Sequence, residues 1–118
     1  MSESIPIHEY LEIVQEEVEG LLEKTIENAH AAATATEIYK AGVFAIQARE
    51  SAGAAIGKFM RVRNDVYKNI GKGAQKSIDD ALLDIEATML AAITHAKDAD
   101  NASIRLMRVK GIGHEQLR

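Results

Sequence analysis

The stretch AGVFAIQARESAGAAIGKF, residues 41–59, decides the fold class of this chain. Its small side chains recur at alternating spacings of four and three residues, which is the repeat of a helix packing along another helix. Alanines at this spacing predict a backbone that lies close to its neighbour, near the lower end of the usual helix spacing of about 8–10 Å. The alanine seam comprises Ala41, Ala45, Ala48, Ala52 and Ala55, and larger residues continue it at Phe59, Val62 and Val66.

Two glycines, Gly53 and Gly57, lie on a neighbouring face of the same helix. They deepen a groove there and share that face with Ile46, Ile56 and Met60. Glycines four residues apart are a weak motif outside an apolar segment of about 20 residues. We therefore base the prediction on the alanine seam and expect the seam, Phe59 and both glycines to form a helix-packing and self-assembly interface.

The composition favours an all-α protein. Hydrophobic residues make up 47% of the 118 residues, aromatic residues only 4%, and proline occurs once. β-branched residues never alternate over a long run, so strand signals are weak. Much of the apolar fraction is alanine, which buries about one methyl group per residue, so a single chain has a thin core that burial between chains would supplement.

Residues 1–118 are predicted to form a single helical domain: an elongated antiparallel bundle of three long helices, with coiled-coil-like packing and Ala-rich seams. The expected elements are helices at about 6–33, 36–70 and 77–110, a glycine-rich turn at 71–76 and a tail at 111–118. Thr34 and Glu37 have the spacing of a capping box, and Ser77 resembles a fresh helix start. Residues 30–37 contain no glycine or proline, so two helices instead of three is the alternative if this segment does not bend.

Charge is segregated along the chain, although the net charge is only −4. Residues 1–37 carry nine acids against one lysine, and residues 38–76 carry eight bases against two acids. Such blocks are typical of helices lying along one another, within a chain or between chains, and equally of solvated polar faces. The basic run that offers an electrostatic partner surface comprises Lys58, Arg61, Arg63, Lys68 and Lys72. A pI of about 5.5 and the lack of interleaved aromatic residues argue against nucleic acid, and an anionic membrane surface is a less favoured partner.

No arrangement of residues predicts chemistry. Glu27 and His30 have the spacing of a helical carboxylate–histidine metal pair, but di-iron bundles need that pair twice, and it occurs once. There is no cysteine, phosphate-binding loop or nucleophile elbow. We therefore predict no catalytic residue, no metal site and no cofactor, and a protein that is not an enzyme.

These observations favour a structural subunit that self-assembles through its alanine-rich helix faces. Its general composition is similar to that of helical subunits of filaments, phage particles and extrusion devices, although no motif supports one of them. The expected partner is the protein itself; the alternative is a small helical adaptor that binds another helical protein, and a membrane-active amphipathic protein is third. The acidic first 20 residues do not resemble a signal peptide, so we expect synthesis in the cytoplasm, with the final location left open.

Overall fold

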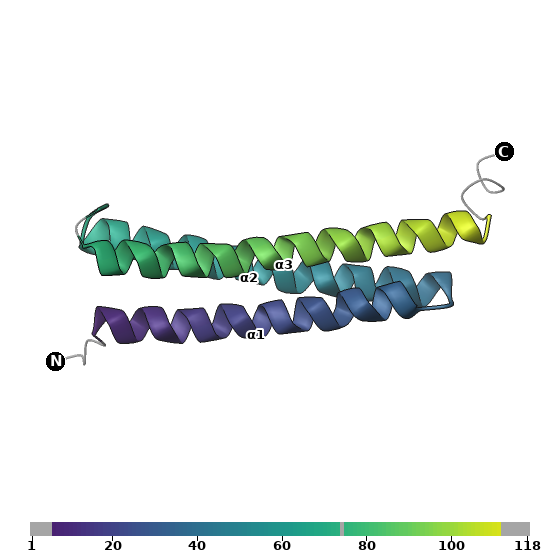
Figure 1. The fold of residues 1–118 in the computed structure, drawn as a ribbon, viewed down its shortest axis with the longest axis horizontal. Coiled ribbons are helices and arrows are strands. Elements are labelled where there is room, and N and C mark those ends of the chain that lie inside the picture. The colour runs from purple at the N-terminus through teal and green to yellow at the C-terminus, as the bar shows by residue number, and fades with distance from the viewer. Residues whose placement is uncertain (1–5, 74, 112–118) are drawn as a thin grey trace.

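A computed structural model describes residues 6–73 and 75–111 of the chain. It contains three helices, α1 (Ile7–Thr34), α2 (Ile38–Asn69) and α3 (Lys76–Val109), and no strand within those ranges. Successive helices run in opposite directions along the length of the molecule (Figure 1). The 34 residues of α3 give the bundle a length of about 50 Å at a rise of about 1.5 Å per residue. The predicted elongated, antiparallel, all-α bundle is confirmed, with helix bounds within about two residues of those expected.

The predicted break between the first two helices is present, but the predicted capping box is wrong. Ala35 and Glu37 have extended backbone, which separates α1 from α2. Thr34 is the last residue of α1, and its hydroxyl donates a hydrogen bond of 3.0 Å to the carbonyl of His30. Because this hydroxyl is used in the last turn of α1, it does not cap α2, and Glu37 precedes α2 without a side-chain capping bond.

Glycine ends α2 as expected. Gly71 has a φ of +102°, a conformation that side chains disfavour, and its N–H donates to the carbonyl of Val66 at 3.2 Å. The start of α3 differs from the prediction, because Ser77 lies inside the first turn and the residue before the helix is Gln75. Apart from Gly111, the predicted tail lies outside the described residues.

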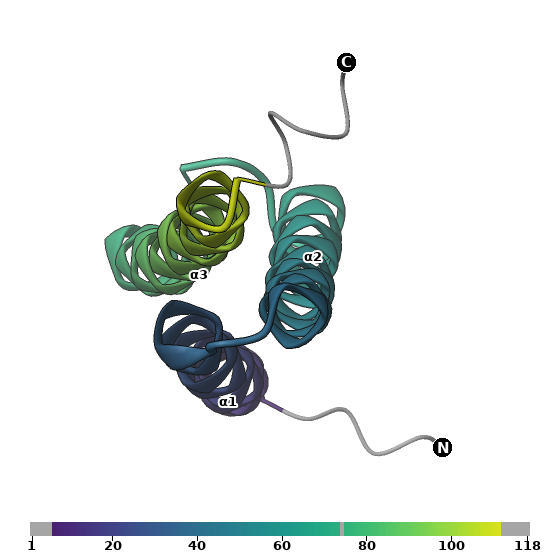
Figure 2. The same cartoon turned by 90° about the vertical axis from the view of Figure 1, so that its right-hand side faces the viewer.

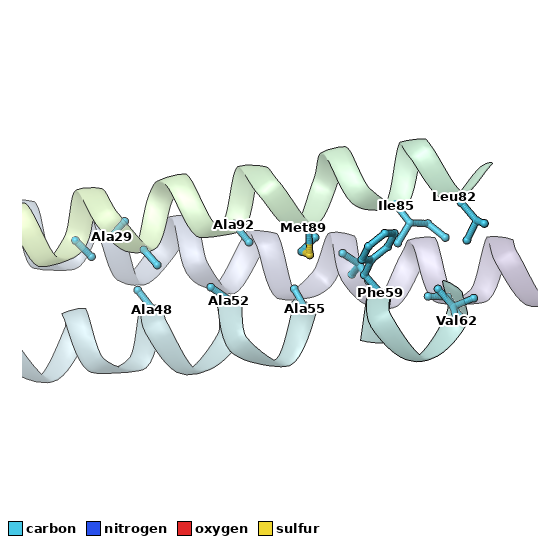
Figure 3. Packing of buried hydrophobic residues seen from close by; sticks show 14 of the residues in the cluster. Ala29, Ala48, Ala52, Ala55, Phe59, Val62, Leu82, Ile85, Met89 and Ala92 are labelled. Carbon is cyan, nitrogen blue, oxygen red and sulfur yellow. The ribbon is translucent and has the colours of Figure 1, made fainter. Parts of the chain in front are cut away.

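The three helices stand at the corners of a triangle when the bundle is viewed from its end (Figure 2). Each presents one stripe to the shared core, whose side chains become smaller along the bundle (Figure 3). The large-residue half of the core consists of Leu11, Val14, Val18, Phe59, Val62, Val66, Ile78, Leu82, Ile85 and Met89. The alanine half consists of Ala29, Ala32, Ala41, Ala45, Ala48, Ala92, Ala96, Ala99 and Ala102, and Ala52 and Ala55 lie between the two halves.

Polar contacts fix how the helices are aligned. A buried pair of hydroxyls, Thr25 on α1 and Ser51 on α2, lies 2.6 Å apart. The Thr25 hydroxyl also lies 2.8 Å from the carbonyl of Leu21. If Thr25 donates to that carbonyl, it accepts the hydrogen bond of Ser51, so both hydroxyls are satisfied inside the bundle. This pair costs little to bury because its hydrogen bonds are complete, and it aligns α1 with α2 at one height.

Candidate interaction surface

The alanine seam lies inside the chain and not on an outer face. Ala41, Ala48 and Ala55 have no exposed surface, and Ala45 and Ala52 are also buried. Phe59 is buried with them, and the guanidinium of Arg63 lies 5.4 Å from the centre of its ring. The seam is buried between the helices of the bundle, which accords with a role in helix packing. The expectation that the seam faces other copies needs correction, because α1 and α3 of the same chain already cover it.

The two glycines of α2 do not mediate contacts within the bundle. Gly53 and Gly57 are exposed, and a Cβ added to either would meet no atom within 4 Å. The predicted role of these residues in helix packing is therefore not fulfilled by α1 or α3. Both glycines instead leave a shallow, side-chain-free area on the outside of α2.

The predicted basic surface is divided between two sides of α2. Lys58 turns toward α1, where its ammonium lies 3.2 Å from the carboxylate of Glu17. Arg63, on the other side of α2, and Lys72, in the turn after the helix, line an open pocket with residues of α3. Arg61 and Lys68 are exposed. The pairing of this basic helix with the acidic first helix is present at one ion pair, and the five bases do not form a single patch.

On the side of α1, Tyr10 also links the helices. Its hydroxyl donates a hydrogen bond of 3.1 Å to the carboxylate of Asp65 on α2. Partial burial, reinforced by the hydrogen bond to Asp65, raises the pKa of Tyr10 above its ordinary value. This contact and the Lys58–Glu17 pair bridge α1 and α2 with polar side chains.

The groove between α2 and α3 has a different character. It is bridged by the largely exposed side chain of Arg49 on α2, whose guanidinium lies 2.9 Å from the carboxylate of Asp100 on α3. Residues three before and four after a bridging residue share its side of a helix. These neighbours are Ile46 and Gly53 beside Arg49, and Lys97 and Ile104 beside Asp100. Large apolar side chains therefore stand exposed on both banks of the groove.

The same arrangement recurs at the other end of this groove. Arg63 and Glu86 line an open pocket of about 280 Å³ between the helices, together with Tyr67 and Leu83. Met60 precedes Arg63 by three residues, and Leu90 follows Glu86 by four, so both lie on the same side. The outer α2–α3 face is hence defined by Tyr39, Ile46, Gly53, Met60 and Tyr67 on α2 and by Leu83, Leu90, Lys97 and Ile104 on α3, each set at seven-residue spacing.

This face collects most of the exposed large apolar side chains of the described chain. Seven of the ten such residues belong to it. The outward side of α1 provides the contrast, because it is dominated by exposed glutamates and has only two exposed isoleucines, Ile13 and Ile26. The glutamates are Glu12, Glu16, Glu19, Glu23 and Glu27. A solvated helix face normally resembles that of α1, so the outer α2–α3 face is the candidate interaction surface.

Sequence reasoning identified part of this face and missed the rest. Ile46, Met60 and the glycines were recognised as a face of α2 beside the seam, but the residues of α3 were not. The signal was available in the seven-residue spacing of Leu83, Leu90 and Ile104, which forms a second apolar stripe beside the buried one. A helix with two such stripes has more apolar surface than one neighbouring helix can cover.

Other kinds of site find no support in the described residues. Glu27 and His30 are exposed, and no group of three potential metal ligands occurs in residues 6–73 and 75–111. None of the three described helices combines the length and apolarity needed to cross a bilayer. In comparisons with known proteins, no protein-family model, curated protein or solved structure matches the chain.

Proposed function

We propose that this protein is a non-enzymatic structural subunit that self-assembles, either into a small homo-oligomer or into a larger particle, filament or extrusion-type assembly. The observation that carries the proposal is the outer α2–α3 face, with its exposed apolar side chains at heptad spacing on both banks of a groove. Contiguous apolar patches beyond a few hundred Å² are rare on monomeric proteins and mark interaction sites.

The proposed contact surface differs from the one that the sequence suggested. Because the alanine seam is covered within the chain, self-assembly through it would require the bundle to open. The outer α2–α3 face needs no such opening. The thin core adds a reason for assembly, since alanine side chains bury little area and contact between copies adds apolar burial.

Light scattering of the purified protein at micromolar concentration tests this proposal. We expect a mass above the 12.9 kDa of one chain, and we expect Met60→Glu to shift the protein toward the monomer. The matched control is Ile26→Glu on α1, because Ile26 and Met60 have similar exposed fractions of 40% and 45%. The control should keep the mass of the wild type. A wild-type monomer throughout the micromolar range, or equal effects of the two substitutions, would contradict the proposal.

A helical adaptor is the second candidate, favoured by the same groove. An amphipathic helix from another protein can lay its apolar face in a groove lined by apolar side chains. The Arg49–Asp100 pair and the pocket residues Arg63 and Glu86 add polar groups between the two helices. The light-scattering experiment separates the two candidates, because an adaptor remains monomeric until its partner is added.

A further inference from the structure

We infer that the pocket beside the α2–α3 turn binds the side chain of Tyr39 from a second copy of the chain. Tyr39 of the first copy occupies the pocket of the second copy in return. The two outer α2–α3 faces then lie against each other, with the two bundles pointing in opposite directions. This inference rests on the proposed self-assembly and specifies how the copies are oriented.

The pocket has the size and the lining for one aromatic side chain. Its volume of about 280 Å³ lies just below the range of about 300–1,000 Å³ that is typical of small-molecule sites. Phe59, Tyr67 and Leu83 supply aromatic and apolar surface, and Arg63 and Glu86 place charged groups beside it. A tyrosine side chain matches this lining, because its ring is apolar and its hydroxyl both donates and accepts hydrogen bonds.

Tyr39 is the apolar side chain of this face that the bundle covers least. Its exposed fraction is 80%, whereas the other six exposed apolar residues of the face have fractions of 37–59%. It is the second residue of α2, and the pocket lies at the far end of the same helix. The 28 residues from Tyr39 to Tyr67 span about 42 Å at about 1.5 Å per residue. Tyr39 therefore reaches the pocket of another molecule and not its own.

The positions of Tyr39 and the pocket determine the relative direction of the two copies. Both lie on one face, at opposite ends, so two overlapping faces bring Tyr39 to the pocket only when the bundles point in opposite directions. A two-fold axis perpendicular to the helices gives this orientation and fills both pockets at once. Overlapping copies that point the same way would leave each Tyr39 about 42 Å from the pocket of the other copy.

The apolar stripe of α2 is matched to this axis. With the axis at Gly53, Tyr39 lies opposite Tyr67 of the second copy, because each is 14 residues from Gly53. Ile46 lies opposite Met60 in the same way, at seven residues from Gly53. At the axis itself, Gly53 has no side chain to keep the two α2 helices apart. These matches follow from spacing along one helix, so they do not depend on how α2 is aligned with α3.

The alignment of α2 with α3 places the same axis on α3. A Cβ built on Gly42 of α2 would lie 4.0 Å from the hydroxyl of Ser103 on α3. Phe59 of α2 and Glu86 of α3 line one pocket, and each is 17 residues from the first contact along its own helix. Both contacts therefore give one alignment. Gly53 is 11 residues beyond Gly42, so the axis crosses α3 about 11 residues before Ser103.

Charge complementarity on α3 supports this axis. Lys97 lies five residues to one side of the axis on α3, and Glu86 lies six residues to the other side. Glu86 is three residues after Leu83 and four before Leu90, so it lies on the same side of α3 as the apolar stripe. The axis thus brings Lys97 of one copy beside Glu86 of the other. Neither residue takes part in an ion pair among the described residues.

The size of the face agrees with a stable dimer. The stripe from Tyr39 to Tyr67 is about 42 Å long, and two adjacent helices are about 20 Å wide. Their product, about 800 Å² on each copy, equals the area that a standard protein–protein interface buries on each partner. A second copy therefore covers the exposed apolar residues of both helices along most of their length.

Tryptophan fluorescence tests the occupant of the pocket, since the chain contains no tryptophan. The emission of a Tyr39→Trp protein should shift to shorter wavelength, and acrylamide should quench it less, as the concentration rises and dimers form. Val109→Trp is the matched control. Val109 is 82% exposed at the same end of the bundle, but it lies five residues beyond Ile104 and so off the side of the face. The control should keep the emission of an exposed indole, and an unshifted Tyr39→Trp protein that still oligomerises would overturn the inference.

A charge-swap experiment tests the orientation. Glu86→Lys and Lys97→Glu, each alone, should raise the dimer dissociation constant about tenfold, because each creates two like-charge contacts in the dimer. An equimolar mixture of the two variants should form heterodimers with affinity near that of the wild type. The two residues are 11 positions apart on one helix, about 16 Å, so this recovery cannot arise within one chain. Circular dichroism checks that both variants keep their helical content.

The outcomes separate this interface from self-assembly in general. A mixture that binds no more tightly than the single variants would refute the proposed orientation. Oligomers whose affinity is unchanged in both single variants would refute this interface but preserve self-assembly. A wild-type protein that stays monomeric throughout the micromolar range would refute both.

Discussion

Where α2 turns into α3, the core holds side chains as large as Phe59 and Ile85, whereas at the opposite end the same helices meet through alanines such as Ala48 and Ala99. A large apolar side chain contributes about 1.5–3 kcal/mol on burial, and an alanine methyl about 0.8 kcal/mol. The large-residue half therefore gains stability from buried area. The alanine half gains less per residue and depends on close approach of the backbones and on the continuity of the helices.

The largest expected effect comes from emptying a site in the large-residue half. Ile85→Ala should lower the free energy of unfolding by about 2–5 kcal/mol, because a fully covered site cannot collapse around the missing atoms. Denaturant unfolding followed by circular dichroism measures the loss. Ile26→Ala is the matched control, since Ile26 is exposed on α1, and it should cost much less. Equal losses at both sites would show that the core is not organised as described.

Filling the alanine half should cost somewhat less. Ala48→Leu adds three carbons at a fully buried position. We therefore expect overpacking to lower the free energy of unfolding by about 1–3 kcal/mol. Ala54→Leu, on the exposed side of the same helix, should stay within about 0.5 kcal/mol of the wild type. Thermal or denaturant unfolding of the pair gives the comparison. An Ala48→Leu protein as stable as the wild type would mean that the alanine half is loosely packed.

The buried hydroxyl pair distinguishes the alanine half by a polar contact. Thr25→Val or Ser51→Ala alone should cost about 0.5–1.5 kcal/mol, the usual net value of one hydrogen bond. The double variant should be about as stable as the less stable single variant, because the second change removes a hydroxyl that has already lost its interhelical hydrogen bond and contacts only a carbonyl of its own helix. A double-mutant cycle of unfolding free energies measures this coupling. Full additivity of the two losses would show that the hydroxyls act independently.

A change that leaves both halves of the core intact should have a smaller and opposite effect. Gly20 lies exposed within α1, and a Cβ there meets no atom within 4 Å. Gly20→Ala should therefore stabilise the bundle by about 0.5–1 kcal/mol through helix propensity. An increase in the unfolding midpoint would verify this. A decrease would indicate that the helix needs the freedom of glycine at this position.

The smallest expected effect is a dependence of the free energy of unfolding on pH. It arises at the large-residue end of the bundle, where the Tyr10 hydroxyl donates a hydrogen bond to Asp65. Because the folded state raises the pKa of Tyr10, the folded protein holds this proton more tightly than the unfolded chain. Stability should then fall as pH rises from about 10, the unfolded value, to the raised folded value. Tyr10→Phe should reduce this decline, as measured by unfolding at several pH values. An identical decline in the variant would assign it to other groups.

The comparison also shows how far sequence patterns reach. The four-and-three spacing of Ala41 through Val66, together with Gly71 and Gly73, predicted the middle helix and its end closely, because periodicity and glycine conformation are local properties. Helix starts were predicted less well. Thr34 and Ser77 fit the composition of caps, but a hydroxyl has several partners within reach, and the folded backbone decided which one it used.

The sequence by itself determined that this chain forms long helices with an apolar stripe at helical spacing, and it left open whether residues 30–37 bend to make three helices or continue as two. It did not determine which helices would cover those stripes. The spacing of a packing seam is the same whether the neighbouring helix belongs to the same chain or to another copy. Only the tertiary structure decided that α1 and α3 cover the alanine seam. By doing so it left the second stripes, from Ile46 to Tyr67 and from Leu83 to Ile104, exposed within the part of the chain that the structure describes. The physical reason is geometric: in a three-helix bundle each helix has two neighbours, and their positions fix which apolar face is buried.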